Sequence, residues 1–376
     1  MKPGILIGML LLYTVSNIYV FSRIWQVVPT HHTLAKVLFI FFAIVLACSM
    51  FASFIWGNLL PLQVLSVLYK IGTAWLMILL YLFMFIALRD LILLSDRWWH
   101  FIPASLGNMQ GFQRMSLLIA LGIGFLFLLG GNIRYWNKKR VELTIETEKA
   151  LPKEEIKIIA ISDMHLGYGI GNGELKKWIK QINSEQADIV LIAGDIIDNS
   201  VRPLEAWHTD EILQQIKAPM GVYACPGNHE YISDMKRSEE FIKKSGICLL
   251  QDSALLIHDA FYIIGRDDRM NPERKSTQEL VQNLDKSKPL ILLDHQPYML
   301  EESVENGIDL QLSGHTHRGQ VWPISIITDR LFEVSHGYLK KEHTHIYVSS
   351  GLGIWGGKFR IGTQSEYVVI NVRHIH

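Results

Sequence analysis

The chain has 376 residues, of which 49% are hydrophobic and 19% charged, and its 36 Lys and Arg balance its 36 Asp and Glu. This length predicts two or three domains, and the composition excludes a disordered chain and a basic nucleic-acid-binding protein. Three cysteines, Cys48, Cys225 and Cys248, are too few for the disulfide framework of a secreted module. The charge is uneven along the chain: up to Asn137 there are eight basic residues against two acidic ones, and beyond it 28 against 34.

Four stretches of the first 137 residues carry no charged side chain. They are Ile5–Phe21, Val37–Leu60, Ile71–Leu88 and Met115–Ile133. At about 1.5 Å per residue each stretch, as a helix, crosses most or all of a hydrocarbon layer of roughly 30 Å. We therefore predict an N-terminal transmembrane bundle of four spans over residues 1–137. The alternative for Ile5–Phe21 is a cleaved signal peptide, but no small-residue cleavage pattern follows it.

The orientation of these spans depends on the Lys and Arg between them. Four spans place the amino terminus and everything after Ile133 on one side, and the densest basic cluster is Arg134, Lys138, Lys139 and Arg140. The cluster favours an inner or plasma membrane protein with a cytoplasmic globular part. Five basic residues oppose this orientation: Arg23, Lys36, Arg89, Arg97 and Arg114. Five tryptophans lie near span ends, as in an interfacial belt: Trp25, Trp56, Trp98, Trp99 and Trp136.

The centres of the predicted spans carry no ionisable residue, which argues against a transporter or channel. Arg89 and Asp90 adjoin the third stretch and form a buried pair only if its helix continues to Leu94. A position at the end of the span is favoured for both. The first 137 residues are therefore predicted to be an anchor, and a transporter with a regulatory soluble part is a less favoured alternative.

Residues 138–376 have the mixed composition of one globular domain with its own core. Alternation predicts a strand at Val141–Glu148, followed by a turn at Leu151–Glu155. Short apolar runs predict five buried strands: Ile156–Ile161, Ile189–Ala193, Gly221–Ala224, Leu290–Leu293 and Leu310–Leu312. Helical segments at Gly173–Ser184 and Leu204–Lys217 imply βαβ crossovers and hence an α/β fold.

Each of the five buried strands is followed by polar residues, which we expect to gather at one edge of the sheet. The candidate ligands are Asp163, His165, Asp195, Asn228, His295, His315 and His317. Oxygen and imidazole donors of this kind hold pairs of divalent first-row metals, which stabilise the attacking and leaving oxygens in phosphoryl displacement. Taken singly, each cluster has a simpler interpretation as a helix cap, a backbone-bonded turn or an exposed strand end. Their shared position after strands favours a metal centre.

These residues carry a resemblance to the calcineurin-like metallophosphoesterase superfamily. Its pattern of D-x-H, G-D, G-N-H-[DE], a lone H and G-H-x-H occurs here in order: Asp163 to His165, Gly194-Asp195, Gly227 to Glu230, His295, and Gly314 to His317. The resemblance covers about Ile156 to Ile370 and implies an α/β/β/α sandwich of mixed sheets over residues 138–376.

The resemblance also implies a role for each residue. One metal ion is expected on Asp163, His165, Asp195 and His317, and the second on Asp195, Asn228, His295 and His315, with Asp195 bridging. His229 is expected to stabilise the transition state and to protonate the leaving oxygen. This role suits a histidine that is free of metal, because it can be protonated near neutral pH.

Two further segments look like the YkuE-type phosphodiesterase branch, whose members are often membrane-tethered. They are Gly314 to Pro323 and Gly351 to Gly362, the latter followed by Glu366 to Ile370. Arg318 departs from the glycine that is more usual there, and either faces the phosphate of the substrate or caps the loop. Asp294 either orients His295 from behind or is exposed.

The remaining candidates have simpler interpretations. Asp198 and Asp267-Asp268 are predicted to be turn residues rather than partners of metal ligands, and Cys225 a small buried hydrophobic residue. The other histidines are expected to have no role in the site: His208, His258, His336, His343 and His345.

The sequence thus predicts a membrane-anchored, metal-dependent hydrolase of a phosphodiester or pyrophosphate, carried by a lipid or an envelope precursor. Manganese is the favoured ion on the resemblance, although iron and zinc also suit these ligands. No specific nucleic-acid binding is expected, and the oligomeric state stays open. The alternative is a non-catalytic membrane scaffold or sensor that retains the fold, which the complete set of ligands disfavours.

Overall fold

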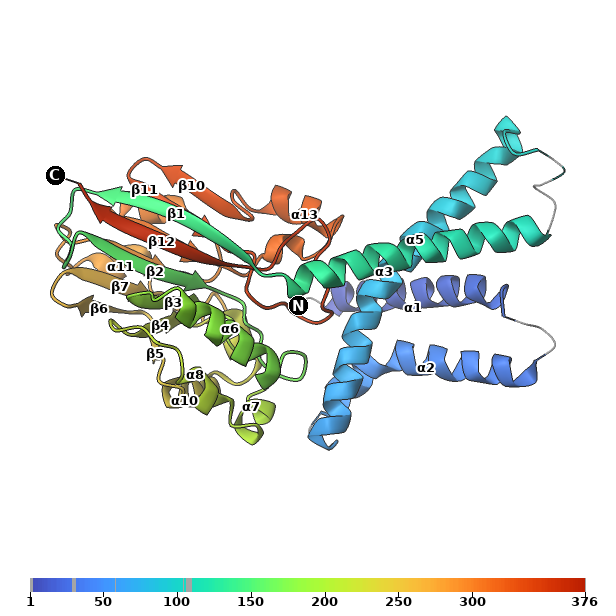
Figure 1. Ribbon diagram of the computed structural model, residues 1–376, viewed down its shortest axis with the longest axis horizontal. Coiled ribbons are helices and arrows are strands. Elements are labelled where there is room, and N and C mark those ends of the chain that lie inside the picture. Colours follow the sequence, from blue (N-terminus) through green and yellow to red (C-terminus); the bar gives the residue numbers. More distant parts are fainter. Residues whose placement is uncertain (1–2, 29–31, 58, 104, 106–109, 376) are drawn as a thin grey trace. The chain divides into compact units, whose positions relative to one another are not determined.

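The computed structural model describes residues 3–28, 32–57, 59–103, 105 and 110–375 (Figure 1). The chain divides into two compact units. The first comprises Met1–Ile133 and Gly356–Phe359, and the second Arg134–Trp355 and Arg360–His376. Each unit is described by itself.

Within its described residues, the first unit contains four helices that are long and apolar enough to cross a membrane. They are α1 (Pro3–Trp25), α2 (Thr33–Ile55), α3 (Leu62–Trp99) and α5 (Gln110–Trp136). The four predicted spans are thus confirmed as helices, but the second ends at Ile55 rather than at Leu60. Pro61, which lacks a backbone N–H, then stands at the start of α3.

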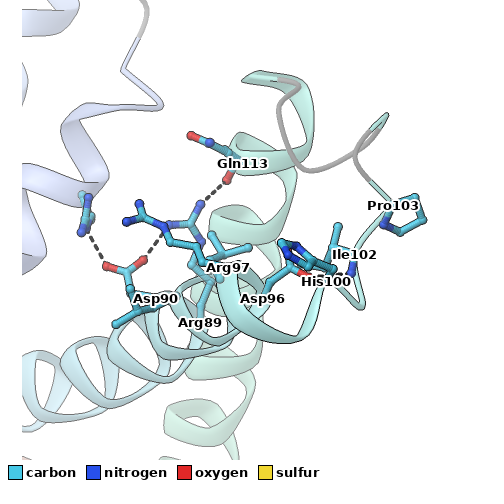
Figure 2. Close-up of a pocket in the computed structure, with 11 residues that line it drawn as sticks. Arg89, Asp90, Asp96, Arg97, His100, Ile102, Pro103 and Gln113 are labelled. Carbon is cyan, nitrogen blue, oxygen red and sulfur yellow. Dashed lines mark hydrogen bonds and ion pairs between the residues drawn. The ribbon is translucent and has the colours of Figure 1, made fainter.

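Arg89 and Asp90 lie inside a helix, because α3 continues without a break to Trp99. At about 1.5 Å per residue this 38-residue helix is longer than a hydrocarbon layer of roughly 30 Å is thick, so the position of the pair at the end of the span stays a prediction. Arg89 Nη1 lies 2.6 Å from Asp90 Oδ1, and Arg23 Nε of α1 lies 2.7 Å from Asp90 Oδ2. The side chains of Arg89 and Asp90 are only 11% and 19% exposed. Figure 2 shows them at the wall of an open hollow of about 730 Å³ within this unit. The Arg23–Asp90 pair joins α1 to α3, and Tyr19 of α1 also donates its hydroxyl to Asp90 Oδ2 over 2.7 Å.

The second unit contains two six-stranded sheets (Figure 1). The strands of the first, in spatial order, are β1 (Lys139–Thr147), β12 (Glu366–His374), β2 (Glu155–Ile161), β3 (Ile189–Ala193), β4 (Val222–Cys225) and β5 (Cys248–Leu249). The strands of the second are β10 (Gly337–Lys341), β11 (Thr344–Val348), β9 (Leu310–Ser313), β8 (Leu290–Leu293), β7 (Phe261–Gly265) and β6 (Ser253–Ile257). Each sheet mixes parallel and antiparallel pairs, as predicted.

The inner faces of the two sheets pack on each other. Ile158 and Leu191 of the first sheet share one buried cluster with Ile263 and Leu293 of the second. Successive side chains of a strand point to opposite faces, so Ile159 points away from that cluster into an outer one. Because both faces of these strands are buried, they are continuous apolar runs rather than alternating ones.

Helices cover the outer face of each sheet. Helices α6 (Asn172–Ser184), α8 (Thr209–Leu213) and α10 (Met235–Lys244) are among those that pack on the first sheet. Leu280 and Val281 of α11 (Thr277–Val281) pack on the second sheet. The layers are therefore α/β/β/α, as the resemblance implied.

The helix predicted at Leu204–Lys217 is wrong in its extent. Two short helices replace it, α7 (Arg202–Ala206) and α8. His208 between them has a φ of +52°, which a continuous right-handed helix does not allow. The apolar residues that suggested one helix are still buried together, because Leu204 of α7 and Leu213 of α8 lie in the same cluster.

We expect Leu293→Ala to destabilise the domain. Leu293 is fully buried between the sheets, and removal of such a side chain costs about 2–5 kcal/mol. The control is Leu255→Ala, since Leu255 is 41% exposed on β6. Thermal unfolding of the detergent-solubilised protein should show a fall in Tm of more than about 5 °C for Leu293→Ala alone. Equal shifts for the two variants would contradict the proposed core.

Candidate metal centre

The candidate ligands follow the carboxyl ends of strands from both sheets. In the first sheet the parallel strands β2, β3 and β4 lead to Asp163, Asp195 and Asn228. In the second sheet the parallel strands β8 and β9 lead to His295 and His315. The expectation of one sheet edge is therefore wrong, because the five strand ends are divided between two facing sheets.

Two hydrogen bonds join these strand ends across the sandwich. His295 Nδ1 donates to the carbonyl oxygen of Ala193, at the end of β3, over 2.7 Å. The backbone N–H of His315 donates to Asp163 Oδ1 over 3.0 Å. Ligands from one sheet are thus positioned by groups of the other, which brings seven separated side chains to one place.

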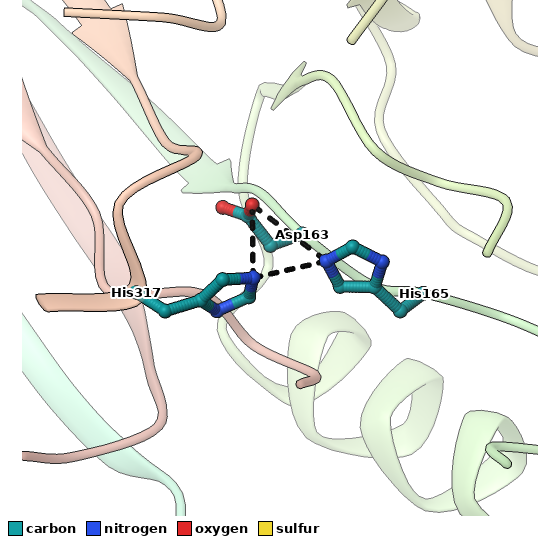
Figure 3. Close-up of side chains that lie close together, drawn as sticks. All are labelled: Asp163, His165 and His317. Atoms are coloured by element: carbon teal, nitrogen blue, oxygen red, sulfur yellow. Dashed lines mark hydrogen bonds and ion pairs between the residues drawn. The ribbon is translucent and has the colours of Figure 1, made fainter. Parts of the chain in front are cut away.

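One group of donors comprises Asp163, His165 and His317 (Figure 3). His165 Nε2 lies 3.0 Å from His317 Nε2, and the two nitrogens lie 3.9 and 3.4 Å from Asp163 Oδ1. All three side chains are buried. Asp195 Oδ2 lies 3.7 Å from His165 Nε2, so that carboxylate also borders this group.

A second group comprises Asp195, His295 and His315. Asp195 Oδ2, which borders the first group, lies 3.2 Å from His295 Nε2. Asn228 Oδ1 lies 2.9 Å from His315 Nδ1, which adds the amide oxygen to this group. The position of Asp195 between the two groups is the one that a bridging ligand requires.

The chemistry of these donors fits divalent cations. His295 Nδ1 carries a proton because it faces a carbonyl oxygen, so Nε2 directs a lone pair toward the Asp195 carboxylate when the ring is neutral and a second proton when the ring is charged. That buried nitrogen forms no hydrogen bond. A lone pair facing a carboxylate is unfavourable unless a proton or a cation lies between them. The structure therefore fits metal ions at these donors, and the individual ligand assignments stay predictions.

The charges of the group are reflected in its pKa values. Burial raises the pKa of Asp163. Burial also opposes ionisation of Asp195, but the His295 and His229 rings hold its pKa well below the usual range. Burial and the neighbouring His295 charge lower the pKa of His315 to about 4, which keeps that imidazole neutral as a ligand must be.

The backbone at the site is unusual. Five of the seven candidate ligands have a positive φ between 46° and 70°: Asp163, His165, Asp195, His315 and His317. Such residues cost of order 1–3 kcal/mol each and cluster at functional sites. Two glycines make the close approach possible. A Cβ at Gly227 would lie 2.2 Å from Asp195 Oδ1, and one at Gly314 would lie 2.3 Å from Asp163 Oδ2.

Glu230 holds the turn after β4 against the end of β3. Its carboxylate accepts hydrogen bonds from the backbone N–H groups of Asp195, Ile197 and Gly227 at 3.0, 3.0 and 2.7 Å. Burial and the Asp195 charge raise the pKa of Glu230 to about 7. The sequence identifies Glu230 only as the last residue of its motif. Its three hydrogen bonds to the backbone become visible only in the fold, because two of the partners follow a different strand.

His229 lies beside the candidate ligands and is oriented by Asp198. Its Nδ1 donates to the carbonyl oxygen of Asp198 over 2.8 Å, and its ring packs edge-on against His165 with centroids 4.5 Å apart. Burial opposes protonation, but Asp195 and Asp198 raise the pKa of His229 to about 9. The prediction that Asp198 is only a turn residue is wrong. Its buried carboxylate lies 3.7 Å from His165 Nδ1 and 3.4 Å from His229 Nδ1.

Arg360 is a residue whose part in the site the sequence did not indicate. Its fully buried guanidinium donates to the backbone carbonyls of His317, Ser350 and Gly353 at 3.0, 2.6 and 2.9 Å. These bonds hold the His317 turn against the loop after β11. The one feature of the sequence that pointed to Arg360 is its position as a single arginine in a glycine-rich segment.

The other predicted residues have structural partners. Asp294 is buried but pairs with Arg266 and Arg274, so neither of the two roles considered for it holds, and the Ala193 carbonyl orients His295 instead. Arg318 is half exposed, with Nε 3.6 Å from Asp329 Oδ1, and its contact with substrate stays a prediction.

The remaining acidic and cysteine positions belong to none of the donor groups. Asp267 and Asp268 are buried and build a turn as predicted, but they also accept hydrogen bonds from Tyr231 and Gln296. Cys225 is fully buried, as predicted.

Comparison with known proteins is consistent with this geometry. The sequence profile described as calcineurin-like phosphoesterase matches residues 156–319. An uncharacterized metallophosphoesterase of Aquifex aeolicus is 34% identical over 62% of this chain and 92% of its own length. The chain belongs to the calcineurin-like metallophosphoesterases. The YkuE-type branch stays a prediction.

Two further relatives of this metallophosphoesterase bear on the helical part. An uncharacterized metallophosphoesterase of Campylobacter jejuni is 27% identical over 97% of this chain and 96% of its own. A transmembrane protein with metallophosphoesterase domain from Danio rerio is 31% identical over 61% of this chain and 56% of its own. Together with the four apolar helices, these relatives identify a membrane protein.

We expect Gly314→Ala to lower the metal content of the purified protein. The added methyl group would lie 2.3 Å from Asp163 Oδ2 and 2.6 Å from Ser162 Oγ, so the carboxylate must move. Displacement of a ligand or of its supporting partner typically costs about 10–100-fold in metal affinity. The matched control is Gly173→Ala in α6, where nothing lies within 4 Å of the added atom. Elemental analysis after dialysis measures the difference, and equal metal in both variants would contradict the assignment.

Proposed function

We propose that this metallophosphoesterase is a membrane-anchored hydrolase of phosphodiester or pyrophosphate bonds that uses two divalent ions. The convergence of seven oxygen and imidazole donors around the shared Asp195 carboxylate is the observation that carries the proposal. When bound there, such ions supply a water nucleophile at neutral pH and charge stabilisation for the phosphoryl oxygens. Manganese is the proposed ion, and iron or zinc suits the same donors.

The proposed roles of the chain's own residues concern protons and orientation. His229 holds a proton at neutral pH, and the Asp198 carbonyl keeps its Nδ1 in place, so Nε2 is the atom that donates to the leaving oxygen. The backbone N–H of His229 donates to Asp195 Oδ1 over 2.9 Å, which ties the acid to the shared carboxylate. Asn228, at the same turn, is proposed both to hold an ion and to contact the substrate.

A phosphodiester is favoured over a monoester because of charge. A phosphomonoester carries about −1.5 to −2 charge near neutral pH. His229 and the proposed phosphate-binding Arg318 are the two candidate cations for the substrate among the predicted site residues. Since Arg318 is half exposed and shares its charge with Asp329, a less charged phosphoryl group is the better match.

The anchor supports a substrate borne by a lipid or an envelope precursor. α5 ends at Trp136 and β1 begins at Lys139, so only Asn137 and Lys138 connect them. Two residues span at most about 7 Å, which keeps the start of the domain close to the end of a membrane-spanning helix. A site tethered in this way has ready access to phosphoesters at the bilayer surface.

We expect His229→Asn and Asp195→Asn to abolish activity in different ways. Loss of a proton donor typically lowers kcat by about 10²–10⁴-fold, so His229→Asn should retain bound metal and lose turnover. Asp195→Asn removes the shared charge and should lose both metal and turnover. Hydrolysis of bis(4-nitrophenyl) phosphate by the metal-supplemented protein, with elemental analysis, measures both quantities. Undiminished hydrolysis by exhaustively chelated protein would refute the proposal, and a cellular phenotype rescued by His229→Asn would favour a scaffold.

A cytoplasmic catalytic domain is proposed from the basic cluster that begins at Arg134, and the chain's own cysteines test it. Cys248 is exposed on the domain, whereas Cys225 is buried. In a Cys48→Ser background, a membrane-impermeant maleimide should label Cys248 in inverted vesicles and leave it unlabelled in intact cells. Labelling in intact cells would place the domain on the outer side.

A further inference from the structure

The helix α13 (Ile324–Leu331) has its polarity reversed relative to a surface helix of a soluble domain. Ser325, which is buried, and Thr328, which is half-buried, form its inner side. Ile324, Ile327 and Leu331 share one face at spacings of three and four residues and are 36%, 57% and 68% exposed. A surface helix normally buries its apolar stripe and exposes its polar one. α13 therefore presents to its surroundings the side chains that other helices of this domain bury.

The exposed apolar surface includes a tryptophan just before the helix and one further isoleucine within it. Trp322, just before α13, is 45% exposed, and Ile326 is 43% exposed. We call Trp322, Ile324, Ile326, Ile327 and Leu331 the apolar ledge. Contiguous exposed apolar patches mark sites of interaction with proteins, ligands or membranes. Asp329 and Arg330 are both exposed on the same helix, so the ledge has one charge of each sign beside it, and the Asp329 carboxylate lies 3.6 Å from Arg318 Nε.

The ledge is joined directly to the candidate metal centre. A Cβ at Gly319, two residues after His317, would lie 2.6 Å from the backbone of Ile324 and Ser325, so the ligand loop and α13 are in close contact. At the other end of α13, the Phe332 ring lies 6.3 Å from the His315 ring and 4.8 Å from the Tyr298 ring. Only the Phe332 ring would then separate an apolar chain lying on the ledge from His315, a predicted metal ligand.

We propose that the apolar ledge docks on a lipid bilayer and holds the metal centre against the headgroups, so that the phosphoester substrate is a lipid. The proposal rests on the proposed function for its substrate class. Three observations select lipid as the occupant: the membrane anchor, the two-residue connection from α5 to β1, and a tryptophan and an arginine beside aliphatic side chains. Interfacial helices that lie in a bilayer surface have this composition.

The first test measures docking without any need for activity. The full chain is used with the two exposed cysteines removed by Cys48→Ser and Cys248→Ser, and the buried Cys225 stays unlabelled. A nitroxide is attached at Leu331→Cys on the ledge. The control carries the nitroxide at Leu255→Cys on β6. In nanodiscs of phosphatidylethanolamine and phosphatidylglycerol, power saturation should show position 331 accessible to oxygen and shielded from a nickel chelate. Position 255 should show the reverse. Chelate access at position 331 would overturn the proposal, and so would spin–spin broadening at 331, which would indicate a second copy on the ledge.

The second test separates docking from chemistry. Ile327→Ser/Leu331→Ser removes apolar area from two exposed positions, so folding should survive, and Leu255→Ser is the matched control. We expect kcat/KM for phosphatidylglycerol in nanodiscs to fall by about tenfold or more relative to wild type, because each buried methylene contributes to interfacial binding. Hydrolysis of soluble bis(4-nitrophenyl) phosphate should stay within about twofold of wild type. An equal loss of activity on both substrates would overturn the proposal that the ledge docks on the bilayer. A wild-type protein that is inactive on both substrates would instead refute the proposed function, and the nitroxide measurement would then decide the docking.

Discussion

The burial of two carboxylates, Asp163 and Asp195, between the two sheets is the constraint on which the rest of the site depends. An isolated buried charge costs several kcal/mol, so a chain retains one only with compensating charges and hydrogen bonds. Here the compensation comes from both sheets: His315 donates its backbone N–H to Asp163, and His295 faces Asp195. The sandwich thus holds an electrostatic arrangement that is completed by cations, which is the physical basis for regarding the site as a metal centre.

The site combines strained backbone with firm support. Five candidate ligands have left-handed backbone conformations, and each such residue costs free energy that surrounding contacts must offset. Glu230 supplies part of that support by binding three backbone N–H groups, and Arg360 by binding three backbone carbonyls. These two buried charged residues act on the main chain rather than on substrate. They keep the turns of the two sheets in register, so that donors from different strands meet.

Two places in the molecule depart in opposite ways from the usual distribution of polar and apolar side chains. In the helical unit, Arg23, Arg89 and Asp90 bring charge among apolar helices and pair with one another. In the catalytic unit, α13 does the reverse, since it keeps aliphatic side chains exposed beside a buried polar centre. Both arrangements are understandable for a protein that works at a bilayer, where a soluble enzyme's rule of apolar inside and polar outside no longer holds.

Local patterns determined most of the strands and the four apolar helices, and they predicted which side chains would gather at the candidate site. Ile189–Ala193 and Leu290–Leu293 are strands at the residues predicted, because runs buried on both faces are recognisable without knowledge of their partners. The four apolar helices followed from composition, whereas the α/β/β/α layers were implied by the family resemblance that the motifs carry.

What only the tertiary structure decided involves contacts between distant segments. Four features depend on such contacts: the break at His208, the Arg23–Asp90 pair, the division of the strand ends between two sheets, and the orientation of His229 by Asp198. Periodicity reports which face of an element is apolar, but not what packs against that face. The exposure of α13 is the clearest case, because Ile324 and Leu331 have the spacing of a buried stripe and only the fold shows that they are 36% and 68% exposed.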